Sequence, residues 1–486
     1  MTGTSSNRLA RWALVGIALV AFGLRALPFF GPEGAWTYRV DYDEGVYFSA
    51  ASYLLQGVLP WRDFVFVHPP GLLFFLAATS AWTHAFLGVD GAFTFARWLA
   101  VLIGVLNTVL VARIVSRWNG PAWASLLAAG FYATYSEIVQ SERGPFLEPL
   151  LNLVCLGLVL ALLHAQASPR RGRWLAFAGV LGGFALTIKL WAVVWVVGAL
   201  WALASFTTRR ELLHFALTVA GTALLLVGPL ALLAPEAFFT QVALFHAWRP
   251  PDSFIARGDR LTQIVSVRHL ASPLLAALTV ALLAWKRQWS PLARISVAAW
   301  ALTLLAFFAS AAWWNQYNAH LIASEALVAG GLFSLLPSRL RGALALASVL
   351  SIGLSISHTV RRSQPTTEHH LSLVRSTLRD SKDCVFTFEP GWSLAAGRLP
   401  ARETGPLIDN YAVQLLNALQ GGTRHFTTTS EAFSANKVIP VGLTHCRYLV
   451  MGERGNRELD LERLSLTHVD TEFEGLAVWE LRAPAR

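Results

Sequence analysis

The chain has 486 residues, of which 55% are hydrophobic and only 14% are charged, and its mean hydropathy is +0.49. A soluble domain is charged at about a quarter of its residues, so this composition excludes a soluble globular protein and indicates a polytopic membrane protein. The net charge of +10 comes mainly from arginines in short clusters between apolar runs. Without a zinc-finger spacing or an RNA-binding signature, these clusters indicate membrane orientation and exclude a nucleic-acid partner.

Residues 12–30 form the first apolar run, preceded by Arg8 and Arg11. No convincing cleavage site follows it, so we expect a first membrane span with its N-terminus in the cytoplasm, rather than a cleaved signal peptide. The acidic segment Asp41-Tyr42-Asp43-Glu44 then lies outside the cytoplasm. Carboxylates packed beside a membrane repel one another and lose solvation, which favours ion binding, proton transfer or a reaction over the alternative of a solvated acidic loop.

Residues 45–58 have the pattern of a short amphipathic helix that ends near Gly57 and Pro60. Residues 69–88 are apolar but are interrupted by His84, and they pose the main ambiguity in the topology. The spans expected after them are 96–112, 121–139, 146–166, 174–188, 190–206, 213–234, 271–285, 292–311, 319–336 and 342–358.

The distribution of loop charge resolves this ambiguity. The basic clusters are Arg113 and Arg117; Arg170, Arg171 and Arg173; Arg209 and Arg210; Lys286 and Arg287; and Arg339 and Arg341. All of them fall in the cytoplasm if residues 69–88 lie in the interface, and all fall on the wrong side if that segment crosses. The positive-inside bias therefore predicts an interfacial helix at 69–88, about eleven spans, and a C-terminus outside the cytoplasm.

The composition changes after residue 360. Residues 384–388 and 446–451 alternate like strands, and 410–419 read as an amphipathic helix, which predicts a small α/β domain with a parallel sheet. We therefore expect a transmembrane catalytic domain at 1–360, with its first extracytoplasmic loop at 31–95, and an extracytoplasmic α/β domain at 361–486. Cys384 and Cys446 each begin a strand, and they form either a disulfide or two unpaired thiols.

Further polar residues lie on the predicted outer face. Lys189 is the only lysine in a hydrophobic segment, and it either binds an anionic headgroup or only extends to the interface. Glu148 lies one turn into an apolar run, which favours a function. Asn318 and His320 open a late span and either bind a phosphate or cap the helix. The sequence predicts that Glu142 and Arg143 pair at the surface, and it assigns no role to Glu325.

Several motifs resemble those of GT-C membrane glycosyltransferases, in particular the family of protein O-mannosyltransferases and lipid A aminoarabinose transferases. The first motif is Asp43-Glu44 followed by Tyr47, and the second is His68-Pro69-Pro70 at the start of the interfacial helix. The third, Leu186-Thr187-Ile188-Lys189, is similar to the family's Leu-Thr-Lys with one residue inserted, and Glu148 replaces an aspartate. The resemblance covers the layout of residues 12–340 but is motif-specific only in the first two hundred.

This resemblance implies an inverting transferase that takes a sugar from a polyprenyl-phosphate donor at the extracytoplasmic face of the plasma membrane. Asp43 corresponds to the family's proposed base for the acceptor hydroxyl, and Lys189 and His320 would stabilise the leaving phosphate. Glu44, the second catalytic candidate, and Glu148 would orient the acceptor or hold a metal. The inserted residue places Lys189 at a different position around its helix from that of the family's lysine. Glu148 has a longer side chain than the family's aspartate, so its carboxylate reaches further into the site.

The residues expected to bind substrate are Tyr47, Arg62, His68, Glu148, Lys189, Asn318 and His320. Asp41 and Asp43 have the spacing of a metal-binding pair, which suggests a divalent cation, Mg²⁺ or Mn²⁺, as the only cofactor. The expected partners are the lipid-linked sugar, membrane lipids and a hydroxyl acceptor on a glycan, a lipid or a protein. A lipid flippase or transporter is the alternative function, although no inverted repeat is visible, and a scaffolding subunit that lost activity is a third.

Overall fold

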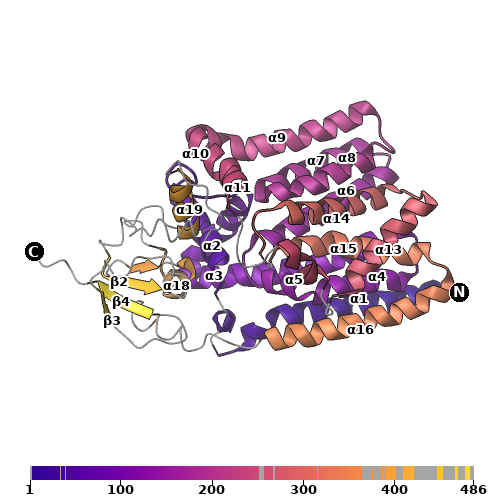
Figure 1. Ribbon diagram of the computed structural model, residues 1–486, viewed down its shortest axis with the longest axis horizontal. Helices are drawn as coiled ribbons and strands as arrows, with labels where there is room; N and C mark the ends of the chain where they lie inside the picture. Colours follow the sequence, from indigo (N-terminus) through magenta and orange to yellow (C-terminus); the bar gives the residue numbers. More distant parts are fainter. Residues whose placement is uncertain are drawn as a thin grey trace, which may run out of the picture. The chain divides into compact units, whose positions relative to one another are not determined.

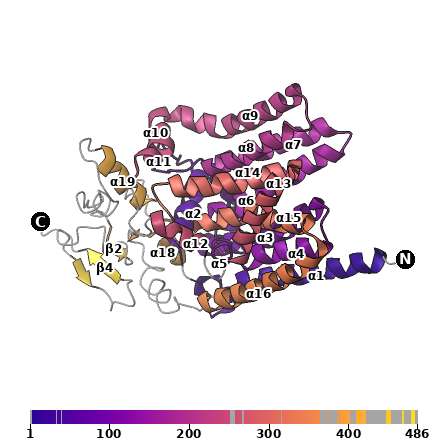
Figure 2. The same ribbon diagram turned by 45° about the vertical axis from the view of Figure 1, so that its right-hand side comes forward.

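The structure is a computed structural model that describes residues 3–32, 34–38, 40–250, 257–265, 269–314, 316–363, 375, 385–387, 389–400, 409–420, 446–451, 466–468 and 477–481. Figures 1 and 2 show its elements from two directions. The chain divides into two compact units. The helical unit comprises Met1–Leu27, Leu99–Leu226 and Ile255–Gln364, and the mixed unit comprises Pro28–Trp98, Val227–Phe254 and Pro365–Arg486.

Helices form at every segment that the sequence predicts to span the membrane. They are α1 (Gly3–Ala26), α3 (Gly71–Val115), α4 (Ala122–Thr134), α5 (Ser136–Ser141), α6 (Leu147–Ala167), α7 (Arg171–Ile188), α8 (Val193–Leu203), α9 (Arg209–Leu233), α13 (Ala271–Lys286), α14 (Pro291–Ala309), α15 (Gln316–Leu335) and α16 (Ser338–Arg362). The short helix α12 (Arg260–Ile264) lies outside the predicted spans. Short 3₁₀ turns are η3 (Ser116–Trp118), η4 (Leu190–Ala192) and η6 (Arg257–Asp259). Among the described residues, 6 helical segments are long and apolar enough to cross a bilayer.

The pairing of α7 with α9 shows how small residues bring these helices together. A Cβ at Gly183 would lie 2.5 Å from the carbonyl oxygen of Val219, and one at Gly179 would lie 3.2 Å from that of Phe215. Two glycines one turn apart on α7 therefore let its backbone touch α9. Such close approach drives helix association in lipid, where burial of apolar surface gives no net gain.

The loops that carry the predicted basic clusters gather at one end of the helical unit (Figure 1). Lys286, after α13, donates a hydrogen bond to the carbonyl of Leu335 at the end of α15 at 2.7 Å. Arg171, the first residue of α7, donates to the carbonyl of Phe206 after α8 at 3.4 Å. A tryptophan of α8 and one from the loop before α14 have ring centroids 5.3 Å apart, and the loop after α3 packs on the end of α15.

Helix α3 is interrupted at Gly88, whose φ of 70° and ψ of −175° are not helical. A positive φ of this kind strains residues that have a Cβ, which explains a glycine here. The break falls at the end of the segment 69–88, so two helical pieces follow one another, as the sequence predicts. The second piece continues into the helical unit.

The mixed unit begins with the 3₁₀ turns η1 (Leu27–Phe30) and η2 (Gly34–Thr37) and helix α2 (Tyr42–Leu55). Its later elements are α10 (Pro235–Phe239), the π-helical turn η5 (Thr240–Leu244), α11 (Phe245–Trp248), β1 (Val385–Thr387), α18 (Pro390–Ala395), α19 (Asn410–Gln420), β2 (Tyr448–Met451), β3 (Leu466–His468) and β4 (Ala477–Leu481). The strand order is β1-β2-β4-β3.

This sheet is mixed, so the prediction of a parallel sheet is wrong in part. β1 and β2 are parallel neighbours, with Val385 opposite Tyr448, whereas β4 runs antiparallel to both β2 and β3. The sequence signal covered only the first two strands. Cys446 is disulfide-bonded, which excludes a free thiol there, and Cys384, its predicted partner, lies outside the described residues.

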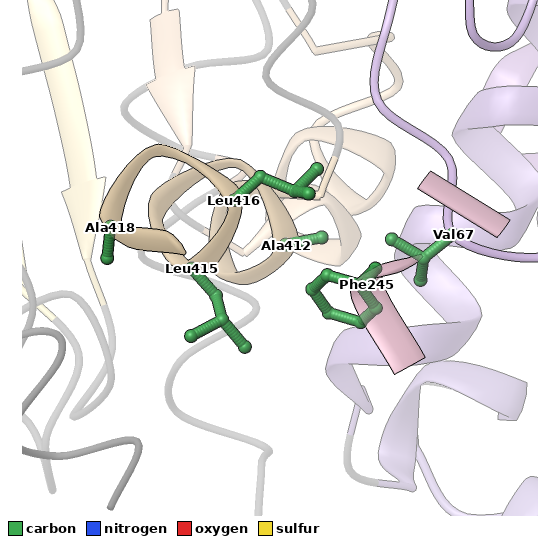
Figure 3. Packing of buried hydrophobic residues seen from close by; sticks show 6 residues of the cluster. All are labelled: Val67, Phe245, Ala412, Leu415, Leu416 and Ala418. Atoms are coloured by element: carbon green, nitrogen blue, oxygen red, sulfur yellow. The ribbon is translucent and has the colours of Figure 1, made fainter. Parts of the chain in front are cut away.

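Helix α2 is buried on nearly every side, which corrects the prediction of an amphipathic helix. Its residues from Glu44 to Tyr53 are all buried, because α18 packs against it and His84 and Phe93 of α3 contact Phe48. The helix ends at the cap residue Gln56, followed by Gly57 with a φ of 77°. In Figure 3, Ala412, Leu415 and Leu416 of α19 form a second apolar cluster with two residues of the same unit, described below.

Candidate functional site

The first turn of α2 is fixed by a capping box. The carboxylate of Asp41 accepts a hydrogen bond from the backbone nitrogen of Asp43 at 3.0 Å, and the carboxylate of Glu44 accepts one from the backbone nitrogen of Asp41 at 2.8 Å. Such a reciprocal pair supplies hydrogen-bond acceptors to backbone N–H groups that have no partner within the helix at its start. Asp43 sits in this first turn with a partly exposed side chain. The three carboxylates thus have different environments.

Glu44 is buried in an ion pair with Arg97 of α3. Arg97 Nε donates to Glu44 Oε2 at 3.0 Å, and Arg97 Nη2 also pairs with Glu44 Oε1. Only 1% of Glu44 and none of Arg97 is exposed. Burial raises the pKa of Glu44, although the attraction of Arg97 and the hydrogen bonds oppose this. Arg97 is not among the residues predicted for the site, although an arginine at the start of an apolar segment signals that a buried partner exists.

The pair of Asp41 and Asp43 stays a prediction as a cation site, and the contacts of these residues give it little support. One oxygen of Asp41 already accepts the amide of Asp43. No group of at least three His, Cys, Asp or Glu side chains with metal-binding geometry occurs among the described residues. Because Mg²⁺ and Mn²⁺ prefer several oxygen ligands, these residues fit such a cation poorly.

Tyr47 and His68 meet inside the mixed unit. The Tyr47 hydroxyl lies 3.3 Å from His68 Nε2, and the two rings are 5.8 Å apart in an edge-on arrangement. His246 of α11 also lies next to His68, with ring centroids 5.8 Å apart, and its Nε2 is 2.9 Å from the carbonyl oxygen of Val67. Two of the predicted substrate-binding residues therefore share one aromatic cluster, to which His246 adds a group that the sequence did not indicate.

Arg62 lies apart from this cluster, at the surface. Its guanidinium makes two hydrogen bonds to the adjacent Asp63, at 2.8 Å and 2.7 Å, and these hydrogen bonds raise the pKa of Arg62. The side chain is 46% exposed. Arg62 is thus an accessible cation whose local partner is its own neighbour in sequence.

In the helical unit, Lys189 and Glu148 form a buried ion pair. The extended residue Lys189 ends α7, and its Nζ donates to Glu148 Oε1 in the first turn of α6 at 2.7 Å. The ammonium group also lies 5.2 Å from the ring centroid of Trp191 and 4.8 Å from that of Tyr317. This lysine is only 6% exposed, so it does not simply extend to the interface, and an aromatic pair and a carboxylate stabilise its charge.

Asn318 and His320 are buried in α15 near this pair. The His320 and Trp191 rings are 6.4 Å apart. Neither ring nitrogen of His320 has a partner in the described part of the chain that meets the criteria of a hydrogen bond. The side-chain oxygen of Asn318 also has no partner there. Both residues lie beyond the helix start, and unsatisfied buried groups of this kind call for a functional explanation.

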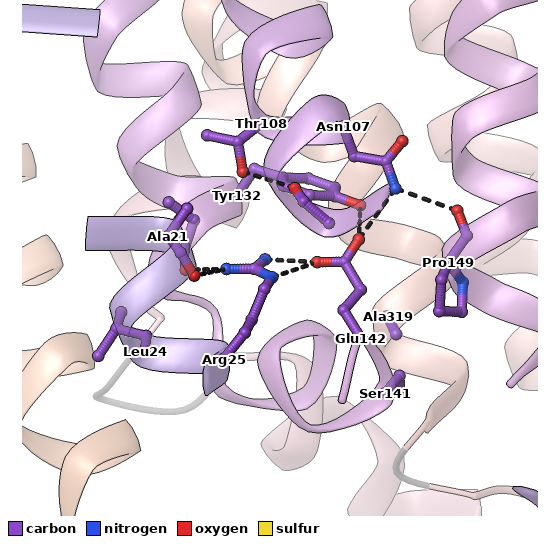
Figure 4. A network of polar contacts seen from close by, with 12 residues as sticks. Ala21, Leu24, Arg25, Asn107, Thr108, Tyr132, Ser141, Glu142, Pro149 and Ala319 are labelled. Carbon is purple, nitrogen blue, oxygen red and sulfur yellow. Dashed lines mark hydrogen bonds and ion pairs between the residues drawn. The ribbon is translucent and has the colours of Figure 1, made fainter. Parts of the chain in front are cut away.

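The predicted surface pair of Glu142 with Arg143 is wrong. Glu142 is fully buried and binds Arg25 of α1, with Nη2 to Oε2 at 2.5 Å and Nε to Oε2 at 2.7 Å. Tyr132 and Asn107 donate to its other oxygen at 2.7 Å and 2.9 Å (Figure 4). Arg143 instead donates to two backbone carbonyls at the end of α1 and to the hydroxyl of a serine after α16.

Glu325 also has hydrogen-bond partners that the sequence alone did not indicate. Its Oε1 accepts from the Ser272 hydroxyl at 2.5 Å, and its Oε2 lies 3.4 Å from the indole nitrogen of Trp300. These bonds join α13, α14 and α15 within the helical unit. A deeply placed carboxyl group with two donors from neighbouring helices is a packing element.

Comparison with known proteins adds independent information. The sequence profile of the dolichyl-phosphate-mannose-protein mannosyltransferase family matches residues 67–239. No curated protein sequence matches significantly. ArnT from Cupriavidus metallidurans in the apo state is similar with a TM-score of 0.66, 14% identity and coverage of 99% of both chains. The chain has the GT-C fold. Among GT-C glycosyltransferases, it resembles the O-mannosyltransferase and ArnT family.

Two further structures with the GT-C fold carry lipid phosphates. ArnT from Cupriavidus metallidurans bound to undecaprenyl phosphate is similar with a TM-score of 0.63 and 14% identity, over 99% of each chain. The oligosaccharyltransferase AglB from Archaeoglobus fulgidus, in complex with an inhibitory peptide and a dolichol-phosphate, gives a TM-score of 0.55 and 12% identity over 92% of this chain and 70% of that one. At these identities the likeness shows the fold, and the activity has to be argued from the site.

Proposed function

We propose that this protein is an inverting glycosyltransferase that moves a sugar from a polyprenyl phosphate to a hydroxyl acceptor at the extracytoplasmic face of the plasma membrane. The observation that carries the proposal is the full-length likeness to ArnT, whose structure with undecaprenyl phosphate is among those matched. The dolichol-phosphate complex of AglB supports the same class of donor. The motifs of the first two hundred residues supply the groups that such a reaction requires.

The arrangement of the loops supports the proposed orientation. All five basic clusters occur at one end of the helical unit, in its loops or in the adjoining ends of helices, and this end would face the cytoplasm under the positive-inside rule. Lys189 and Glu148 lie at the ends of α7 and α6 that are remote from those loops. Eleven crossings then place the N-terminus inside, and the C-terminal α/β domain, residues 361–486, outside.

Asp43 is the proposed general base. It is partly exposed in the first turn of α2, and it is the residue that corresponds to the proposed base of the family that the chain resembles. The base takes the proton of the acceptor hydroxyl while the oxygen attacks the anomeric carbon. The bond from that carbon to the phosphate oxygen breaks, the lipid phosphate leaves with the bonding electrons, and the configuration inverts. Glu44 has a positioning role through Arg97.

Lys189 is the proposed binding group for the phosphate. Its ammonium is already held in a fixed position by Glu148 and two aromatic rings, and a preorganised cation stabilises the charge that develops on the leaving group. His320 and Asn318 supply further polar atoms that have no partner in the described residues. His68 with Tyr47, and the exposed Arg62, are proposed to contact the sugar or the acceptor.

The test replaces Asp43 with Asn, which keeps the shape of the side chain and removes its basicity. Sugar transfer from polyprenyl-phosphate donors is measured with the purified protein in lipid, and donor binding is measured separately. We expect turnover to fall by about 10²–10⁴-fold with donor affinity retained. Asp90→Asn is the matched control, because Asp90 is also a partly exposed aspartate of the mixed unit. Normal transfer by Asp43→Asn would rule out this base.

A further inference from the structure

The residue before Asp43 is bound to the C-terminal part of the chain, within the mixed unit. The Tyr42 hydroxyl donates to Asp409 Oδ1 at 3.1 Å and accepts from the backbone nitrogen of Tyr411 at 3.0 Å. Asp409 also caps α19, since the same carboxylate oxygen accepts from the backbone nitrogen of Ala412 at 3.0 Å. One hydroxyl therefore uses both its donor and its acceptor capacity to join the start of α2 to the start of α19.

The residue two positions after Asp43 touches the C-terminal part as well. A Cβ at Gly45 would lie 2.4 Å from the backbone nitrogen of Gly391 in α18, and a Cβ at Gly391 would lie 2.0 Å from Cγ1 of Val40. Real side chains do not approach so closely, so two glycines bring the backbones of α2 and α18 into contact. All residues of α18 are buried, so α18 is a packed part of the mixed unit against which α2 can be positioned.

Helix α19 is itself anchored. Its residues Leu415 and Leu416 belong to an apolar cluster with Val67 and Phe245 (Figure 3). Arg249, just after α11, donates to the Tyr411 hydroxyl at 2.6 Å, and its guanidinium lies 5.2 Å from that ring. The helix that receives Tyr42 is thus held by two other segments of the mixed unit, and Val67 directly precedes His68.

We propose that α18 and α19 position the base, with Tyr42, Asp409 and the contact between Gly45 and Gly391 setting the place of Asp43. The C-terminal part then acts as a support for the catalytic helix. This inference rests on the proposed function, since it takes Asp43 as the base. Because a displacement of about 1 Å in a reacting group lowers a rate by about a hundredfold, small shifts of this first turn have measurable effects.

Tyr42→Phe is the first test, because it removes the bridging hydroxyl and leaves the Asp409 cap of α19 intact. We expect kcat to fall by about ten- to a hundredfold with the KM for the donor unchanged, and amide hydrogen exchange at residues 42–47 to accelerate. Asp409→Asn should keep most of the activity, since Asn both accepts from Tyr42 and caps a helix, whereas Asp409→Ala should not. Tyr448→Phe, in β2, is the matched control.

Gly45→Ala is the second test, and it separates positioning from general helix stability. Alanine favours a helix over glycine, yet here its methyl group has to push α18 away. We expect kcat to fall at least tenfold, whereas Gly228→Ala in α9, where a Cβ meets open space, should have no effect. Wild-type kcat and wild-type exchange at residues 42–47 in both Tyr42→Phe and Gly45→Ala would overturn the inference. Faster exchange with unchanged kcat would uphold the mechanical link and refute Asp43 as the base.

Discussion

The ion pair of Glu44 with Arg97 allows a test of whether Glu44 stabilises the fold while Asp43 acts in the reaction. Both side chains are almost completely buried, so Glu44→Gln leaves an unpaired guanidinium and Arg97→Met leaves an unpaired carboxylate. Removal of one partner of a buried pair costs about 3–5 kcal/mol. We expect the double variant to lose about 2 kcal/mol less than the sum of the two single losses, because contacting residues are coupled.

The assay is equilibrium unfolding of the detergent-solubilised protein, with sugar transfer measured on the same preparations. Glu211→Gln is the control, because its partner Arg171 lies 4.0 Å away in an exposed pair, and such pairs add little stability. Single variants as stable as the wild type would refute the structural role of Glu44. If Glu44→Gln stays stable but loses as much turnover as Asp43→Asn, then Glu44 acts in the chemistry.

Four further outcomes follow from the contacts described. Burial raises the pKa of Glu44 above its usual value of 4.5, so the folded protein holds a proton at Glu44 more tightly than the unfolded chain does. The contribution of Glu44 to the free energy of unfolding should therefore decline as the pH rises from about 4.5 to the folded pKa, and level off above it. Glu44→Gln should remove this pH dependence from equilibrium unfolding curves. Glu142→Gln should destabilise the protein by about 3–5 kcal/mol in the same unfolding assay, because Arg25 loses its buried partner. Glu148→Gln should tighten binding of polyprenyl phosphate and Lys189→Met should weaken it, measured by titration, because the carboxylate competes with phosphate for the ammonium. Turnover should survive dialysis against EDTA, and loss with recovery on added Mg²⁺ or Mn²⁺ would restore Asp41 as a ligand.

The sequence predicted the helices well because their signal is local. Each expected span is a continuous run of apolar residues, which can be recognised without knowledge of the rest of the chain. The break at Gly88 falls where the apolar run 69–88 ends. The partners of buried charges were not predictable in this way. Arg97 and Glu44 are 53 residues apart, and Arg25 and Glu142 are 117 apart, so only the packing of distant segments brings them together.

The same limit applies to the C-terminal contacts of α2. The sequence shows Tyr42 and Gly45 as neighbours of the acidic motif, but their partners at 409 and 391 follow from tertiary packing alone. The cost of an arginine within an apolar segment does signal that a partner must exist. It leaves the identity of that partner open, which is why Glu142 was assigned to the adjacent Arg143.

The proposed orientation in the membrane would rest on five separate basic clusters at one end of the helical unit. Neutralising Arg209 and Arg210, for example, leaves four positively charged turns to retain the chain on the same side of the bilayer. Under the proposed orientation, loss of any single cluster would therefore leave the direction of insertion unchanged.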